Sequence, residues 1–498
     1  MTTIAKNYDA YGASSPFLQY VFKNSTNRKY IIIAFIAGLV QLTLFKILYP
    51  YPDFISDSYS YIETNLYHMK VNLWPIGYSI FIGFIHLFTS SHVFLVYVQY
   101  IILLVTFLYF FFSVLYLYGL SRRFALILYI FLFFNPMFLV LANCVLSDAI
   151  FCAVSLILFT QYLWMYYKPA PANLVFQALL IGVAFVIRYT AIYYPIVSVF
   201  AILLAGYKWP LKFIGMVLPW LLIFPFILYT QQETKKLTGT AEFSVFGGWQ
   251  IANNALYMYG NIQVDSTQLP PGTLELDREA RAFWKATPPT EADLAELPGT
   301  FFIKVPSAIL KPYLRTHGWA TLPGAPGGFQ AWGSVSPIYN AYGKWLIQHY
   351  PIEFARYYLW LNVKNYFIPH LEKFGSYNIG MREVWDPAKI WFNMKSNKVT
   401  LIPPIQFQGL IFFIFPLFFM ALNIFFAGCV IFFLTNKKLR QANKPLLIAL
   451  LMALAFLIIN FGFSVFATPV VLRYQIVPMI VLLTFTLLLT EKQFEEQS

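Results

Sequence analysis

Apolar residues occur along this chain in long blocks that short polar segments separate. The blocks are about 17 to 25 residues long, the length that an α-helix needs to cross roughly 30 Å of hydrocarbon. Lipid offers no partners for backbone polar groups, and the chain lacks the alternation of a membrane β-barrel. The pattern therefore predicts an all-α integral membrane protein with about ten transmembrane helices. The predicted spans are residues 30–48, 93–118, 124–141, 147–167, 174–188, 191–206, 213–230, 408–434, 446–466 and 471–489.

Residues 73–90 contain a further apolar run, which begins after Trp74-Pro75. If this run crossed the membrane, every later loop would change sides. The basic pair Arg122/Arg123 and the cluster at 437–444 would then face outward, against the positive-inside rule. We therefore predict that residues 73–90 form a helix that lies in the membrane interface or dips partway into the membrane.

The basic loops place both long polar segments on one side of the membrane. With residues 1–29 as a cytoplasmic N-terminal segment, the basic clusters beside the spans fall on the cytoplasmic side. Residues 30–230 then form a membrane domain whose first outer loop is 49–92. Residues 231–407, with charges of both signs and Pro-rich joints, are predicted to fold as a non-cytoplasmic domain, and 408–498 contain the C-terminal membrane helices.

Composition supports a membrane protein and argues against a nucleic-acid partner. Hydrophobic residues make up 59% of the chain and charged residues only 11%, against about 25% charged in a typical soluble domain. The formal charge of +13 comes mostly from basic residues in short loops, where they set topology. The three cysteines are too few and badly placed for a disulfide framework or a metal site.

The first outer loop presents a carboxylate on a polar stripe. If residues 56–68 are helical, Asp57, Tyr61 and Asn65 share one face because they are spaced four residues apart. Asp57 could act as a general base on an incoming hydroxyl or amine, or could help to hold a divalent metal. The alternative is that Asp57 caps the helix N-terminus.

Further ionisable residues lie at the outer ends of the predicted spans. Asp148 begins the fourth span, as a second acidic group or as a helix cap. Arg188 and Arg473 lie at outer ends, against the positive-inside rule, where they could bind a lipid phosphate or simply extend to the headgroups. His68 and Lys70 follow Asp57 and could also reach a phosphate.

Two segments of the predicted outer domain mix amide, aromatic and ionisable side chains. One contains Asn253 and Asn254, and the other contains His370 and Glu372. Such mixtures suit sugars, whose ring faces pack on aromatics and whose hydroxyls bind amides. Neither a nucleotide-binding loop nor a nucleophile elbow or zinc motif is evident.

Several short motifs, taken in order, resemble the GT-C superfamily of polyprenyl-phosphate-dependent glycosyltransferases. They cover roughly the N-terminal half of the chain and its last thirty residues. The motifs are Asp57-Ser58 with Tyr61, Pro75-Ile76-Gly77-Tyr78, Asn135-Pro136, Leu146-Ser147-Asp148, Ile187-Arg188-Tyr189 and Leu472-Arg473-Tyr474. The resemblance implies that Asp57 is the catalytic base, with Asp53 as the fallback. Asp148 stands where the family often has Glu, which leaves its second acidic or metal-site role open.

These observations predict a glycosyltransferase that moves a sugar from a polyprenyl-(di)phosphate donor to a lipid, glycan or protein acceptor. Asp57 and Asp148 would be catalytic, and Arg188, Arg473, His68 and Lys70 would bind the donor phosphate. Tyr61, Asn253, Asn254, His370 and Glu372 would contact substrate, and Mg²⁺ or Mn²⁺ at Asp57 and Asp148 is a candidate cofactor. The expected location is the cytoplasmic (inner) membrane with the site facing out, and the other expected partners are membrane lipids. The alternatives are an O-antigen ligase or polymerase, and a lipid-linked glycan transporter or flippase.

Overall fold

The computed structural model describes residues 16–297, 299–467 and 469–497, and it is 77% helical. These residues form no β-strand and only three isolated β-bridges. Eight of the described helical runs are long and apolar enough to cross a membrane. The protein is thus an all-α, multi-pass membrane protein, as predicted. The eight runs are α3 (Ser25–Leu48), α6 (His92–Tyr118), α7 with α8 (Arg122–Phe133, Pro136–Asn143), α9 (Asp148–Tyr167), α12 (Trp209–Thr238), α22 with α23 (Phe407–Phe412, Phe415–Thr435), α25 (Lys444–Ala467) and η7 with α26 (Leu472–Gln475, Ile476–Gln497).

Two of the ten predicted spans correspond to shorter helices. α10 (Pro171–Ile187) is followed by the 3₁₀ turn η1 (Tyr189–Tyr193) and α11 (Tyr194–Leu204). The helix breaks at Arg188, whose backbone is extended with φ −148°. Whether this pair crosses the membrane fully stays a prediction.

The apolar run at residues 73–90 contains the ten-residue helix α5 (Gly77–His86). At 1.5 Å per residue it is about 15 Å long, half of what a span requires. Its length fits the expectation that residues 73–90 do not cross the membrane. Their placement in the interface stays a prediction.

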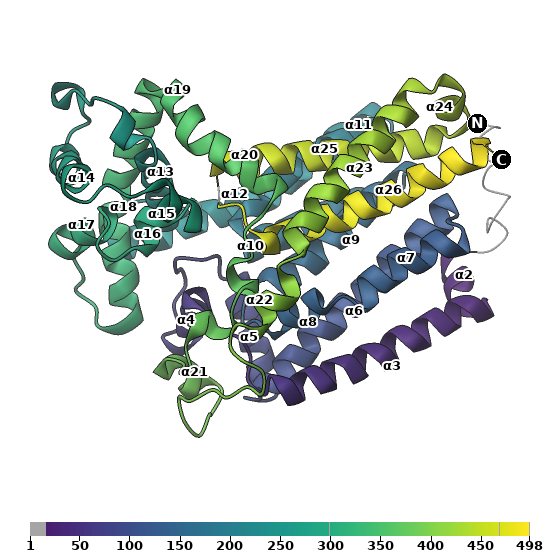
Figure 1. Ribbon diagram of the computed structural model, residues 1–498, viewed down its shortest axis with the longest axis horizontal. Helices are drawn as coiled ribbons and strands as arrows, with labels where there is room; N and C mark the ends of the chain where they lie inside the picture. The colour runs from purple at the N-terminus through teal and green to yellow at the C-terminus, as the bar shows by residue number, and fades with distance from the viewer. Residues whose placement is uncertain (1–15, 298, 468, 498) are drawn as a thin grey trace.

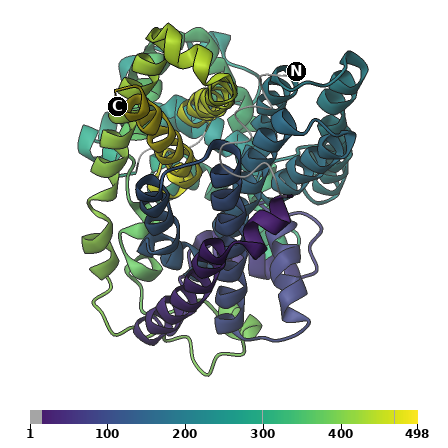
Figure 2. The same cartoon turned by 90° about the vertical axis from the view of Figure 1, so that its right-hand side faces the viewer.

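The long helices lie side by side as a bundle, seen from the side in Figure 1 and from one end in Figure 2. α2 (Phe17–Lys23) and the C-terminal end of α26 lie at one end, together with the basic helix α24 (Lys437–Ala442). At the other end lie α4 (Ser56–Leu66), α5 and the helices of the second polar segment. Both polar segments therefore occupy the same end of the bundle.

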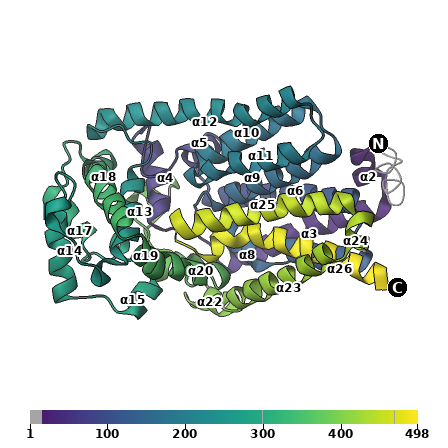
Figure 3. The same ribbon diagram turned by 90° about the horizontal axis from the view of Figure 1, so that it is seen from above.

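The 30-residue helix α12 continues from the bundle into the second polar segment, as Figure 3 shows. Its length of about 45 Å exceeds the hydrocarbon thickness, so its last turns extend beyond the bundle. There Thr238 packs so closely on Gly333 that a Cβ at this glycine would lie 2.2 Å from the threonine methyl group. The helix thus continues past the predicted boundary at residue 230.

The second polar segment has its own apolar core, centred on α13 (Val245–Leu256) and α18 (Gly324–His349). Trp249 is fully buried between these helices and stacks on Trp332 with 3.9 Å between ring centroids. A glycine at position 248 allows the close approach, because a Cβ there would lie 2.2 Å from a backbone oxygen of α18. The other elements of this segment are η2 (Tyr259–Asn261), η3 (Ser266–Gln268), α14 (Leu274–Ala286), α15 (Glu291–Glu296), α16 (Phe301–Lys304), α17 (Leu310–His317), α19 (Pro351–Phe354), the π-helix η4 (Ala355–Leu359), α20 (Trp360–Phe367), η5 (Glu372–Phe374), η6 (Tyr377–Gly380) and α21 (Asp386–Trp391).

The two polar segments contact each other directly. Asp53, the fallback residue for the catalytic base, is buried, and its Oδ1 accepts a hydrogen bond from the backbone N–H of Asn378 at 3.0 Å. Burial raises the pKa of Asp53 to about 7, although this hydrogen bond and the nearby Lys373 partly oppose the shift. Tyr59 and Trp385 stack at 4.4 Å. Asp53 thus joins the two segments instead of facing a cavity.

Candidate functional site

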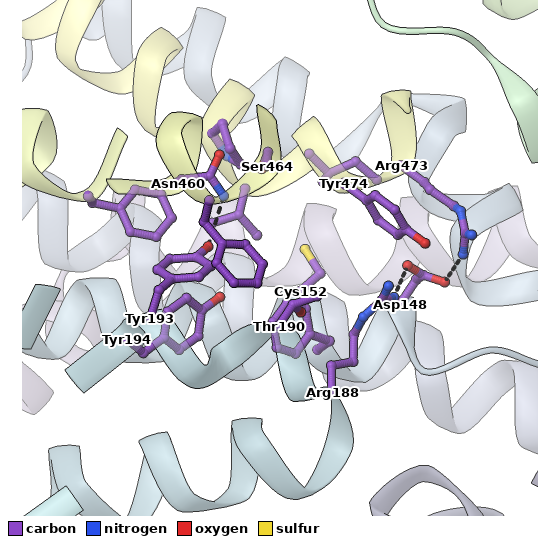
Figure 4. Close-up of a pocket in the computed structure, with 16 residues that line it drawn as sticks. Asp148, Cys152, Arg188, Thr190, Tyr193, Tyr194, Asn460, Ser464, Arg473 and Tyr474 are labelled. Atoms are coloured by element: carbon purple, nitrogen blue, oxygen red, sulfur yellow. Dashed lines mark hydrogen bonds and ion pairs between the residues drawn. The ribbon is translucent and has the colours of Figure 1, made fainter. Parts of the chain in front are cut away.

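The candidate site is built around Asp148, a buried carboxylate at the first residue of α9. Its two oxygens bind two different arginines, as Figure 4 shows. Arg188 Nη1 donates to Oδ1, and Arg473 Nη1 donates to Oδ2 at 2.9 Å. The outward-placed arginines that the sequence singled out therefore converge on one carboxylate. Neither extends alone toward lipid headgroups.

Breaks between helices bring these three residues together. Arg188 is the extended residue between α10 and η1, and Arg473 lies in η7 between α25 and α26. Asp148 follows the turn between α8 and α9. All three breaks lie toward the end of the bundle that carries the two polar segments, so long-range packing of the helices sets the geometry.

The ring of Tyr474 lies against both guanidinium groups. Arg188 Cζ lies 4.6 Å from the ring centroid and Arg473 Cζ lies 4.5 Å from it. An aromatic face attracts a cation through its quadrupole, and the attraction grows when the pair is removed from water. Asp148 and Tyr474 together therefore hold two like charges close to each other.

A second carboxylate, Glu372, extends the charge cluster toward the outer segment. Its Oε2 accepts from Arg473 Nε at 3.0 Å, and its Oε1 accepts from Lys304 Nζ at 3.0 Å. Lys373 Nζ lies 3.8 Å from the same Oε1. Burial alone would raise the pKa of Glu372, but Arg473, Lys304 and Lys373 outweigh it and hold the pKa well below its usual range. Glu372 is therefore ionised across the physiological pH range.

The sequence analysis did not identify Lys304 or Lys373. Lys304 lies 68 residues before its partner in the chain, and no spacing rule connects the two. The position of Lys373 directly after the candidate Glu372 was the one available signal. Of the four basic residues that the sequence predicted for the donor phosphate, Arg188 and Arg473 lie in this cluster, and Lys304 and Lys373 lie there in addition.

A small cavity of about 60 Å³ lies beside the Arg–Asp–Arg cluster. Asp148, Arg188, Arg473 and Tyr474 line one end, while the rest of its wall is mostly aromatic and aliphatic. A cavity of this size can hold ordered water but is far below the range of about 300–1,000 Å³ for small-molecule sites. A larger anion could reach the arginines only by moving side chains and competing with Asp148 for them.

Asp57 lies in the first turn of α4 and is partly exposed. Its carboxylate accepts one hydrogen bond in the described part of the chain, from the Ser56 hydroxyl at 3.2 Å. None of the described backbone N–H groups donates to it, so it lacks the contact that defines a capping side chain. It lies close enough to Lys373 and Arg473 to interact with their charges, although it does not line the small cavity.

The predicted polar face of α4 is present. Tyr61 is buried and its hydroxyl lies 3.2 Å from the Ser147 hydroxyl, directly before Asp148. Asn65 Nδ2 donates to the backbone oxygen of Ser79 in α5 at 2.9 Å. Tyr61 on this face therefore contacts the start of α9, while Asn65 contacts α5.

His68 and Lys70 lie past the other end of α4, exposed to solvent. The whole helix α4 has eleven residues and is about 16 Å long, so its last residue lies well away from Asp57 in the first turn. Lys70 Nζ lies 3.9 Å from the Glu233 carboxylate in α12, and neither residue contacts the arginine cluster. The prediction that His68 and Lys70 bind phosphate remains untested. Their distance from the arginine cluster does not support it.

The predicted sugar-binding amides are buried and have partners within the protein. Asn253 Nδ2 donates to the backbone oxygen of Gly299 at 2.8 Å, and its Oδ1 accepts from Phe302 N at 3.1 Å. Asn254 Nδ2 donates to the Phe466 backbone oxygen at 3.2 Å. These bonds fix the outer segment to itself and to the end of α25. Their predicted contact with substrate stays untested.

The residues proposed for a divalent cation do not fit one as they are placed. Both oxygens of Asp148 are bound to guanidinium groups, which would repel a cation. Asp57 is a single, partly exposed carboxylate, and Asp148, which is occupied by two arginines, does not form a two-carboxylate site with it. In the described ranges no three His, Cys, Asp or Glu side chains converge as metal ligands. No step below uses a metal.

Fold and site together define a multi-pass α-helical membrane protein with a buried Arg–Asp–Arg cluster at one end of its bundle. No protein-family model, curated protein or solved structure matches the chain. The features of the molecule that point to a function are therefore the cluster, the cavity beside it and the carboxylate of Asp57.

Proposed function

We propose that the protein is a membrane glycosyltransferase that moves a sugar from a polyprenyl-phosphate-linked donor to a hydroxyl- or amine-bearing acceptor. The observation that carries the proposal is the convergence of Arg188 and Arg473 on Asp148. Two guanidinium groups held at the end of a lipid-exposed bundle suit a phosphate that is attached to a lipid chain.

The donor phosphate would bind by exchange with Asp148. A phosphate oxygen can accept from each arginine as a carboxylate oxygen does now, so the ligand replaces an interaction that is already formed. Arg188 and Arg473 would also stabilise the charge that develops on the leaving phosphate. Asp148 keeps both side chains positioned while the site is empty of donor.

Asp57 would act as the general base. The oxygen or nitrogen atom of the acceptor attacks the anomeric carbon and forms a bond to it, while the bond between that carbon and the phosphate oxygen breaks. The proton passes to the Asp57 carboxylate, and polyprenyl phosphate leaves with the electron pair of the broken bond. Partial exposure keeps Asp57 accessible to an acceptor, and its position near Lys373 and Arg473 places it beside the proposed phosphate site.

The proposed location is the cytoplasmic membrane of a bacterium, with the site on the outer side. Basic residues at the α24 end of the bundle support this orientation, because such residues stay in the cytoplasm. The acceptor would then be a lipid, a glycan or a protein on that side.

The proposal is tested by following the donor lipid in cells. Deletion of the protein should cause a glycosylated polyprenyl phosphate to accumulate, as lipid mass spectrometry would detect. The wild-type protein should remove the accumulated lipid, and the Asp57→Asn variant at equal abundance should not. A flippase would instead move the labelled lipid across vesicle membranes without cleaving its sugar bond, and that outcome would overturn the proposal.

A further inference from the structure

A second, larger cavity lies on the outer side of the charge cluster, with a volume of about 320 Å³. It is enclosed by three separate parts of the chain: the segment around α15 and α16, the residues after α20, and the connection from α25 to α26. Its lining includes Thr300, Lys304, His370, Leu371, Glu372 and Val471. The volume is at the lower end of the range of about 300–1,000 Å³ for small-molecule sites, which suits one small ring.

The cavity lining combines donors, acceptors and an apolar wall. Lys304 and Thr300 can donate hydrogen bonds, while Glu372 can accept several. Burial lowers the pKa of His370, so its imidazole is neutral at physiological pH and can both donate and accept. Leu371 and Val471 provide apolar surface. Among the charged residues of the lining, Lys304 is paired with Glu372 and Glu296 is an exposed carboxylate, so the cavity does not select for an anionic ligand.

We propose that this cavity binds one neutral sugar ring, with Glu372, Lys304 and His370 as its polar contacts. The inference rests on the proposed function for its link to the donor. A ring of hydroxyls matches a wall of mixed donors and acceptors, and the apolar side chains suit the C–H face of the ring.

The position of the cavity links the ring to the phosphate site. Arg473 lines the small cavity and Glu372 lines the large one. Arg473 Nε donates a hydrogen bond to Glu372 Oε2 at 3.0 Å. A phosphate on Arg473 would therefore place a directly attached sugar beside Glu372. The same cavity could equally hold a terminal sugar of the acceptor, since donor and acceptor sugars present the same ring of hydroxyls.

Binding to the purified full-length protein distinguishes the two sources. The probes are a long-chain polyprenyl phosphate, its glucosyl derivative and free methyl glucoside, measured by native mass spectrometry in detergent. His370→Trp fills the cavity without removing a partner of Arg473, and Thr300→Val removes one hydroxyl at nearly constant volume. His349→Trp, at an exposed position at the end of α18, is the matched control. Thermal unfolding confirms that each variant is folded.

If the cavity holds the donor sugar, glucosyl polyprenyl phosphate binds at least about tenfold more tightly than polyprenyl phosphate. His370→Trp should remove that difference, Thr300→Val should reduce it, and polyprenyl phosphate should bind both variants like the wild type. If the cavity holds an acceptor sugar, methyl glucoside binds to protein loaded with polyprenyl phosphate, and His370→Trp abolishes this binding.

The inference is overturned if the glucosyl group adds no affinity and methyl glucoside does not bind. It is also overturned if His370→Trp changes neither the affinity for glucosyl polyprenyl phosphate nor that for methyl glucoside. A failure of polyprenyl phosphate itself to bind the wild type would instead contradict the proposed function. In that case binding of methyl glucoside still reports on the cavity, so the two failures can be told apart.

Discussion

Arg473 Nη1 donates a hydrogen bond to Asp148 Oδ2 at 2.9 Å, although the two residues lie 325 positions apart in the chain. The bond joins the start of α9 to the connection before α26, and both side chains are buried. A buried ion pair stabilises little beyond an apolar pair of the same shape, but removal of one partner leaves an uncompensated charge. The cluster is therefore a sensitive point for both stability and ligand binding.

Asp148→Asn should destabilise the protein strongly. The substitution leaves Arg188 and Arg473 facing each other without their shared counter-charge, which costs about 3–5 kcal/mol for a buried pair. Thermal unfolding in detergent should show a lower midpoint, and the second substitution Arg188→Gln should restore part of the loss. Glu275→Gln, at an exposed carboxylate, serves as the control. An unchanged midpoint in Asp148→Asn would show that the two arginines tolerate the loss of their shared counter-charge, which would contradict this prediction.

Asp57→Asn should abolish transfer and leave folding intact. The carboxylate accepts a single hydrogen bond from Ser56, which an amide oxygen can also accept. Loss of a general base lowers a rate by about 10²–10⁴-fold. Asp386→Asn, in the first turn of the outer helix α21, is the matched control and should retain activity. Full activity of Asp57→Asn in a donor-consumption assay would remove Asp57 from the mechanism.

Asp53 should make stability fall as the pH rises. Its pKa is raised from about 3.9 in an unfolded chain to about 7, so the folded state holds the proton more tightly. This contribution is complete below about pH 4 and decreases by about 1.4 kcal/mol per pH unit until about pH 7. Asp53→Asn should flatten this slope and exceed the wild type in stability above pH 7. Unfolding midpoints measured from pH 4 to pH 8 check this, and an equal slope in both proteins would contradict it.

Chelation of divalent cations should leave transfer intact. Both oxygens of Asp148 are occupied by arginines, and guanidinium groups at the site can neutralise a phosphate without a metal. Donor consumption should therefore be equal with and without EDTA. Activity that EDTA abolishes and Mg²⁺ or Mn²⁺ restores would require a cation site that Asp57 and Asp148, as placed, do not form.

The membrane architecture could be predicted from the sequence because hydropathy alone determines which segments suit lipid. Eight long runs coincide with predicted spans, and a ten-residue α5 explains why residues 73–90 resembled a span without being long enough. The pair 174–188 and 191–206 is less regular, since the break at Arg188 shortens both helices. The predicted boundary between the two spans, at residues 188–191, coincides with this break.

The site could be predicted only in part. The charge rule identified Arg188 and Arg473 as exceptions, and these two residues converge on Asp148. The roles of Asn253 and Asn254 were harder to foresee, because a buried amide that bonds backbone looks the same in sequence as one that awaits a sugar. Lys304 was missed since its contact with Glu372 depends on tertiary packing across the outer segment.

The central claim is that the arginine cluster binds a lipid phosphate, and a direct binding measurement tests it. Long-chain polyprenyl phosphate and the uncharged polyprenol are titrated against wild type, Arg188→Gln and the exposed control Arg278→Gln. The account predicts that the wild type and Arg278→Gln bind the phosphate in preference to the alcohol. Arg188→Gln should weaken phosphate binding by at least about tenfold and leave polyprenol binding unchanged. Equal affinity of wild type and Arg188→Gln for the phosphate, or no preference for phosphate over alcohol, would contradict the account.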